Sequence, residues 1–221
     1  MPNKSLVLIG SLLTGSLLFA NISRADNGVM LEVTITNLTH GQPLAPVLVA
    51  THEPGVAFFE EGEAPSDELA WLAEAGNGQP MADYLWTLEA VDDVQISTGG
   101  LTFPGDSTTV QVWAQTPNDH ISVGSMLGAT NDAFFAIKDL PLPTKGTKTV
   151  TYMASAYDAG SETNDELATT VAGLGGEAYS PNDSGEGFVH IHSGIHGIGD
   201  ADPAVLDWRN PVARIIVNRV K

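Results

Sequence analysis

The chain has 221 residues, with 9 Lys and Arg against 27 Asp and Glu and a formal net charge of −18. Such a surface repels nucleic-acid phosphates and anionic lipids and attracts cations, so the composition argues against a nucleic-acid-binding protein. The chain contains no cysteine. This excludes disulfides and attachment of a lipid at a lipobox cysteine, and leaves packing and bound metal to hold the fold.

The amino-terminal residues have the pattern of a secretory signal peptide. A lysine stands near the start, residues 6–20 form an apolar run, and Ser23 and Ala25 are small residues at the two positions that a signal peptidase reads. The run is too short for a membrane span, although an uncleaved anchor is the alternative. We therefore predict a signal peptide over residues 1–25, an exported protein that is periplasmic or secreted, and no membrane span after cleavage.

Alternation of apolar and polar residues predicts a series of short strands. The expected strands cover residues 31–36, 47–51, 108–114, 121–126, 134–137, 147–153, 187–192 and 212–218. Between the second and third of them, Ser66 is placed to cap a helix over residues 67–75, which Gly76 ends. Residues 81–90 are expected to form a second short helix or a loop.

Short strands and long connections, with 23 Gly and 13 Pro, predict an all-β fold, an antiparallel β-sandwich with one or two short helices in its loops. The first and last strands both read as members of a sheet, so residues 26–221 are expected to form one domain. Residues 155–186 are rich in Gly, Ser, Asn and acids. A segment of that length is expected to carry a ligand.

Two carboxylates, Asp158 and Glu162, lie on either side of Gly160 at the start of that segment. A third, Asp132, stands immediately before an apolar strand, and a hairpin with a generous loop would bring it beside the other two. Calcium prefers several oxygen ligands, and a glycine between ligands lets the backbone fold tightly around the ion. The alternative is a solvated acidic turn. The pattern therefore predicts a calcium site on Asp132, Asp158 and Glu162.

The histidines suggest a different metal. His190 and His192 are two residues apart on an expected strand and would face the same side, and His196 follows on a turn between glycines. Imidazole suits copper, zinc or nickel, so these three residues are the candidate ligands of an alternative transition-metal site. Two ligands alone bind weakly, and the sequence fixes no third. Replacing His190 and His192 by Gln is therefore expected to change neither calcium-dependent melting nor uptake of copper or zinc.

The sequence shows no assembled catalytic motif. There is no cysteine nucleophile, and Ser193 lacks the G-x-S-x-G context of a nucleophile elbow. No phosphate loop or dinucleotide fingerprint occurs. We therefore expect a protein that is not an enzyme.

Several segments together resemble the spondin domain, the amino-terminal module of extracellular matrix spondins that also occurs as a stand-alone exported bacterial protein. The matching segments are 33–39, 48–52, 72–76, 125–134, 157–162, 194–197 and 207–215. Each segment alone is weak, but their order and their spread over residues 30–220 make the resemblance specific. It implies an antiparallel β-sandwich related to C2 domains, with calcium bound at one end.

In that family the calcium carboxylates lie before one strand and in an aromatic-D-A-G-x-[DE] segment, which correspond here to Asp132, Asp158 and Glu162. Animal members have Asp at the last position, so Glu162 is a departure. Animal members also carry cysteines and thrombospondin-type repeats, which this chain lacks, so their matrix or receptor binding does not transfer. The resemblance implies a non-enzymatic calcium-binding module for adhesion or for contact with an unidentified extracellular or envelope component.

Overall fold

A computed structural model describes residues 28–115 and 119–220 of the chain. The predicted signal peptide, residues 1–25, lies outside the described residues. Within the described ranges, no helix is long and apolar enough to cross a membrane.

Within residues 28–115 and 119–220, nine strands form the fold, and every strand pair among them is antiparallel. The strands are β1 (Gly28–Asn37), β2 (Leu48–His52), β3 (Val91–Ile96), β4 (Ser107–Gln115), β5 (His120–Met126), β6 (Ala133–Pro141), β7 (Thr149–Asp158), β8 (His190–Ile191) and β9 (Ala213–Arg219). The order across the sheet is β3-β2-β5-β6-β7-β9-β1-β4, and β8 pairs with β7 off this path. The predicted all-β antiparallel fold is confirmed.

The short helices lie in the connections. They are α1 (Asp67–Ala75), α2 (Gln79–Leu85), α3 (Pro203–Leu206) and a 3₁₀ turn, η1 (Ala172–Leu174). The predicted start and end of α1 are confirmed, because the Ser66 hydroxyl accepts the Leu69 amide hydrogen at 3.2 Å and Gly76 adopts a φ of 63°. α3 was not predicted, and α2 begins and ends earlier than residues 81–90.

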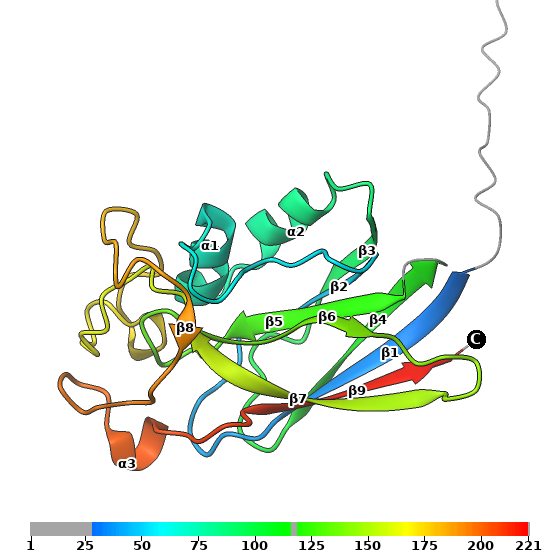
Figure 1. The fold of residues 1–221 in the computed structure, drawn as a ribbon. Coiled ribbons are helices and arrows are strands. Elements are labelled where there is room, and N and C mark those ends of the chain that lie inside the picture. The colour runs from blue at the N-terminus through cyan, green and yellow to red at the C-terminus, as the bar shows by residue number, and fades with distance from the viewer. Residues whose placement is uncertain (1–27, 116–118, 221) are drawn as a thin grey trace, which may run out of the picture.

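The strand β7 joins two layers of sheet (Figure 1). Its residues 149–154 pair with β9, whereas residues 155–158 pair with β6. The first layer therefore contains β4, β1, β9 and the start of β7, and the second contains β3, β2, β5, β6 and the end of β7. The sheet nearly closes on itself, because the Asp93 carboxylate on β3 accepts the Trp113 amide hydrogen on β4 at 2.8 Å.

Two apolar cores explain the sequence pattern. The main core lies between the two layers, where every second residue of β1 is buried, as its alternation predicts. A second core lies on the outer face of β2, β5 and β6, where α1 and α2 cover Leu48, Ala50 and Phe134 (Figure 1). The strand β2 is thus buried on both faces. Its first three residues are apolar, and its buried polar residues Thr51 and His52 are hydrogen-bonded to the Trp113 carbonyl and the Ser122 hydroxyl.

The long connection between β7 and β8, residues 159–189, is gathered at one end of the sandwich beside α1 (Figure 1). It contains the turn η1 and returns to β7 through β8, which has only two residues instead of the predicted strand over 187–192. This connection brings distant polar residues to the end of β7, where the acidic residues predicted from the sequence are found.

Candidate metal centre

Asp132 is completely buried immediately before β6. One carboxylate oxygen, Oδ2, accepts the backbone N–H groups of Ser161 at 2.8 Å and Glu162 at 3.1 Å. The other oxygen, Oδ1, has no hydrogen-bond partner. Buried polar atoms are nearly always satisfied, so an unpartnered carboxylate oxygen in this position calls for a ligand, an ion or a water molecule.

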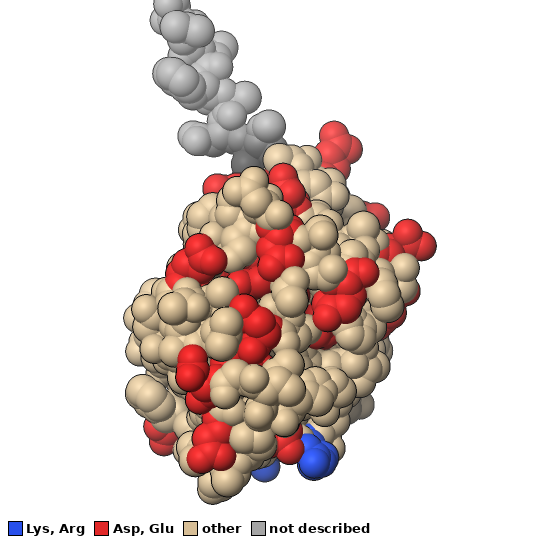
Figure 2. All heavy atoms as spheres, turned by 90° about the vertical axis from the view of Figure 1, so that its left-hand side faces the viewer, with Lys and Arg blue, Asp and Glu red and all other residues tan. Residues whose placement is uncertain are grey.

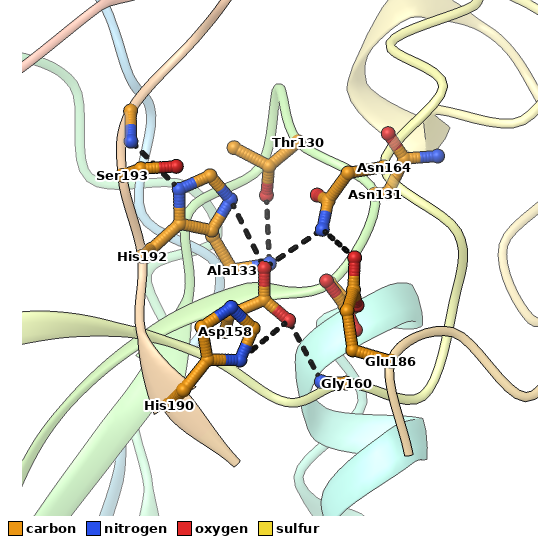
Figure 3. A network of polar contacts seen from close by, with 12 residues as sticks. Thr130, Asn131, Ala133, Asp158, Gly160, Asn164, Glu186, His190, His192 and Ser193 are labelled. Carbon is orange, nitrogen blue, oxygen red and sulfur yellow. Dashed lines mark hydrogen bonds and ion pairs between the residues drawn. The ribbon is translucent and has the colours of Figure 1, made fainter. Parts of the chain in front are cut away.

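Asp158 is the last residue of β7 and lies opposite Ala133 and His190 in the sheet. Its Oδ1 accepts the Gly160 amide hydrogen at 2.8 Å, and its Oδ2 accepts a hydrogen from the Asn164 amide, also at 2.8 Å (Figure 3). The structure thus fixes the direction of this carboxylate from both sides.

The two aspartates influence one another electrostatically. Burial raises the pKa of Asp132 well above its usual range, and the charge of Asp158 raises it further. Burial also raises the pKa of Asp158, although the hydrogen bond from Asn164 works in the opposite direction. Without a cation, this pair is therefore stabilised by holding a proton. A bound cation would supply the compensating charge instead.

The carboxylate of Glu162 belongs to a different group of residues. The backbone N–H of Glu162 donates to Asp132, but its side-chain Oε1 accepts the Ser180 hydroxyl hydrogen at 3.0 Å. The Ser180 amide donates to Glu74 at 2.7 Å, so two buried glutamates meet at this serine. Burial, with a smaller contribution from Glu74, raises the pKa of Glu162 to about 8. Of the three predicted calcium ligands, the structure brings Asp132 and Asp158 together and directs the Glu162 side chain elsewhere.

Two residues that the sequence did not single out as ligands complete the oxygen-rich side of the site. The Asn164 amide that holds Asp158 also donates to Glu186 at 3.3 Å (Figure 3). The charge of Glu186 raises the pKa of both Asp132 and Asp158. Glu186 reaches the site only because the long connection returns there, so no local pattern could have identified it.

The two histidines of β8 and the turn after it stand on the other side of Asp158 (Figure 3). His190 Nδ1 lies 3.8 Å from Asp158 Oδ1, and His192 Nε2 lies 3.7 Å from Asp158 Oδ2. They face the same side, as their spacing predicts. Burial, helped by the neighbouring histidines, lowers the pKa of His192 to about 4. The acids and the histidines, which the sequence presents as alternative metal sites, therefore meet at a single carboxylate.

His196 is not part of this arrangement. Its Nδ1 lies 3.3 Å from the Glu166 carboxylate, and its Nε2 lies 2.9 Å from the Ser193 hydroxyl. Glu166 is buried, has a φ of 58°, and accepts the amide hydrogens of His196, Gly197 and Ile198. Glu166 lies in the acid-rich segment 155–186 and has no local motif that distinguishes it, whereas the structure shows that it holds the turn after β8 in place.

The side chains at the site have the donor chemistry for a hard cation, but they are not arranged as a complete set of metal ligands. Among the residues that the structure describes, no group of three or more His, Asp or Glu side chains is arranged to hold a metal ion as it stands. The unpartnered Asp132 Oδ1, together with the oxygens of Asp158, Asn164 and Glu186, nevertheless matches the donor chemistry that calcium prefers.

No protein-family model matches the chain, and no curated protein matches it. The resemblance to the spondin domain therefore stays a prediction that rests on the segments quoted above.

Proposed function

We propose that this chain is an exported, non-enzymatic, spondin-like module that binds calcium and works in adhesion or in contact with an extracellular or envelope component. The observation that carries the proposal is the Oδ1 atom of Asp132, which is buried without a partner beside the equally buried Asp158. Ionised carboxylates packed together repel one another, and a cation between them removes that repulsion.

The proposed ligands are Asp132, Asp158, Glu186 and the side-chain oxygen of Asn164. All four can supply oxygen, and water completes the six to eight contacts that calcium takes. Two come from strand ends and two from the connection after β7, so the bound ion would tie this connection to the sheet.

The charge of the surrounding surface supports a cation at this end. Figure 2 views the molecule from the end that carries the long connection, and Asp and Glu side chains are spread over that face. Lys and Arg appear only at its lower margin. Such a field raises the local concentration of cations.

A catalytic role finds less support. Ser193, His196 and Glu166 follow one another at contact distances, in the order of a nucleophile, a base and an acid. Acyl transfer also needs donors for the developing oxyanion, commonly the amide after the nucleophile. Here that amide, from Gly194, donates to His192 Nδ1 at 3.0 Å instead.

Calcium-dependent melting tests the proposal. Binding to the folded state alone stabilises it by about 2.7 kcal/mol at a hundredfold excess of calcium over Kd. The melting temperature should rise with calcium, fall again with chelator, and lose most of this response in Asp158→Asn. Asp83→Asn, the same change at an exposed position of helix α2, is the matched control and should respond like the unaltered chain. A melting curve of the unaltered chain that calcium does not move would contradict the proposal.

A second pair of variants tests the ligand set. Glu186→Gln should weaken the calcium response, whereas Glu162→Gln should retain it, because the Glu162 carboxylate is directed to Ser180. The reverse result would restore Glu162 as the ligand that the resemblance implies. For export, amino-terminal sequencing of the protein recovered outside the cytoplasm should begin at Asp26.

A transition-metal-binding protein is the second candidate function. The observation that favours it is that His190 and His192 each lie near a different carboxylate oxygen of Asp158. Asp158 is the third ligand that this second proposal would use. Titration with zinc distinguishes it from the calcium proposal, since zinc accepts imidazole and calcium does not.

A further inference from the structure

The hydrogen bonds of His192 determine which of its nitrogens carries a hydrogen. The amide N–H of Gly194 donates to His192 Nδ1 at 3.0 Å. An imidazole nitrogen can accept only when it carries no hydrogen, and a neutral ring carries one hydrogen in all. The hydrogen of His192 therefore resides on Nε2, the nitrogen that is 3.7 Å from Asp158.

The fold holds this arrangement firmly. Gly194 has a φ of 98°, and a Cβ atom added to it would lie 2.3 Å from the Asp207 carboxylate. The next amide, from Ile195, donates to the same carboxylate at 3.1 Å. The ring of His192 is buried and packs on Trp208, with 5.0 Å between the ring centroids. Neither the Gly194 amide nor the imidazole is free to turn away.

The same reasoning applies to His190. Its Nδ1 lies 3.2 Å from the carbonyl oxygen of Phe188, which can only accept, so Nδ1 carries the hydrogen. That nitrogen is also the one 3.8 Å from Asp158. In both histidines, the nitrogen nearest to Asp158 thus presents a hydrogen and not the lone pair that a metal requires.

We propose that His192 is a hydrogen-bond donor that positions Asp158 for a hard, oxygen-seeking cation, and that it is not a metal ligand. The proposal rests on the proposed calcium function and names the class of cation that the site accepts. Zinc at His192 would require the hydrogen to move to Nδ1, where it would oppose the Gly194 amide hydrogen. The Nε2–H group has no partner in the structure, and a cation-bound Asp158 offers it an acceptor.

Nuclear magnetic resonance measures the position of the hydrogen directly. In a ¹⁵N-labelled sample near neutral pH, two-bond ¹⁵N–¹H correlations should show His192 with a bare Nδ1 and a protonated Nε2. His192→Met identifies the signals. A protonated Nδ1 on His192 overturns the proposal, whatever the metal-binding results.

Metal titrations of the full exported chain test the consequence. The unaltered chain should bind calcium and take up no stoichiometric zinc. His192→Met, which keeps the bulk but removes the donor, should weaken calcium binding by about 10–100-fold, as losing a hydrogen bond to a ligating group does. His192→Gln places an N–H group at similar reach and should recover most of that loss. His196→Gln is the control and should change nothing, because this ring is exposed and contacts Glu166 and Ser193.

The outcomes separate the two proposals. No calcium binding by the unaltered chain overturns both. Calcium binding that is equally tight in His192→Met overturns the positioning role alone. Stoichiometric zinc binding that is lost in His192→Gln shows that His192 is a ligand, and establishes the transition-metal function in place of the present inference.

Discussion

Gly160 is the residue on which the geometry of the acidic pair most directly depends. It adopts a φ of 67°, donates its N–H to Asp158, and approaches Phe188 so closely that an added Cβ would lie 2.3 Å from the Phe188 carbonyl oxygen. Gly160→Ala should lower the free energy of unfolding by about 2–4 kcal/mol, combining left-handed strain with overpacking, and should weaken the calcium response.

Urea denaturation with and without calcium measures both effects. Gly100→Ala is the matched control, because Gly100 has a φ of 74° with no atom within 4 Å of the added Cβ. It should lose only about 1–2 kcal/mol from backbone strain and keep the calcium response. Equal losses in the two variants would mean that the contact with Phe188 has no energetic consequence.

Glu162 predicts a pH dependence of stability. Its pKa is raised to about 8 in the folded protein, from 4.5. The folded state therefore favours the protonated side chain, so its contribution to stability is fully present below about pH 4.5 and is lost as the pH rises to about 8. Comparison with Glu162→Gln isolates this contribution, on the order of 2–4 kcal/mol. The difference between the two chains in unfolding free energy, measured in chelator, should change with pH in this window. If the difference in unfolding free energy does not change with pH, the Glu162 carboxyl group is solvated in the folded protein and the prediction is wrong.

At the scale of elements, the sequence predicts secondary structure best where a local pattern of residues is sufficient to define the element, such as a strand with one buried face or a helix with its own cap. The alternation of β1 and the capped α1 are of this kind, and both are confirmed. The strand β3 was not predicted, and β8 was predicted too long, each for a physical reason. Two adjacent acids in β3 interrupt the alternation of apolar and polar residues that would predict a strand. The strand β8 has only two residues, and their pairing depends on the return of the chain to β7.

The candidate site follows the same rule. Asp132 and Asp158 lie at strand ends, which local patterns can locate, and the structure brings them together. The direction of the Glu162 side chain, the arrival of Glu186 and the meeting of Asp158 with the histidines all depend on the path of residues 159–189. Only the folded chain specifies that path.

The cap of α1 allows a prediction at this scale. Ser66→Ala removes the acceptor for the Leu69 amide hydrogen and should lower the free energy of unfolding by about 1 kcal/mol. Because α1 packs on the second core and supplies none of the proposed calcium ligands, the stabilisation by calcium should be unchanged. Urea titrations at two calcium concentrations check this, and a changed calcium effect would show that the helix and the site are coupled.

At the scale of the whole molecule, the two layers meet through β7, and the acidic pair lies where β7 ends. The strand that transfers from one layer to the other also presents Asp158 to the long connection. An ion bound there would therefore stabilise a junction between layers as well as a loop, so its effect should appear in the cooperative unfolding of the entire sandwich.

The near closure of the sheet has a consequence for association between chains. β3 and β4 are the two ends of the strand order, and an uncovered strand edge is a template for aggregation. Here the two edges face one another. The Asp93 carboxylate accepts a hydrogen bond from the Trp113 amide, and the Thr51 hydroxyl donates one to the Trp113 carbonyl. Side chains thus occupy backbone groups that would otherwise recruit a second molecule. A carboxylate at each end of the sandwich thus has a separate effect: Asp93 covers a backbone amide at the sheet edge, and Asp158 lies in the proposed cation site.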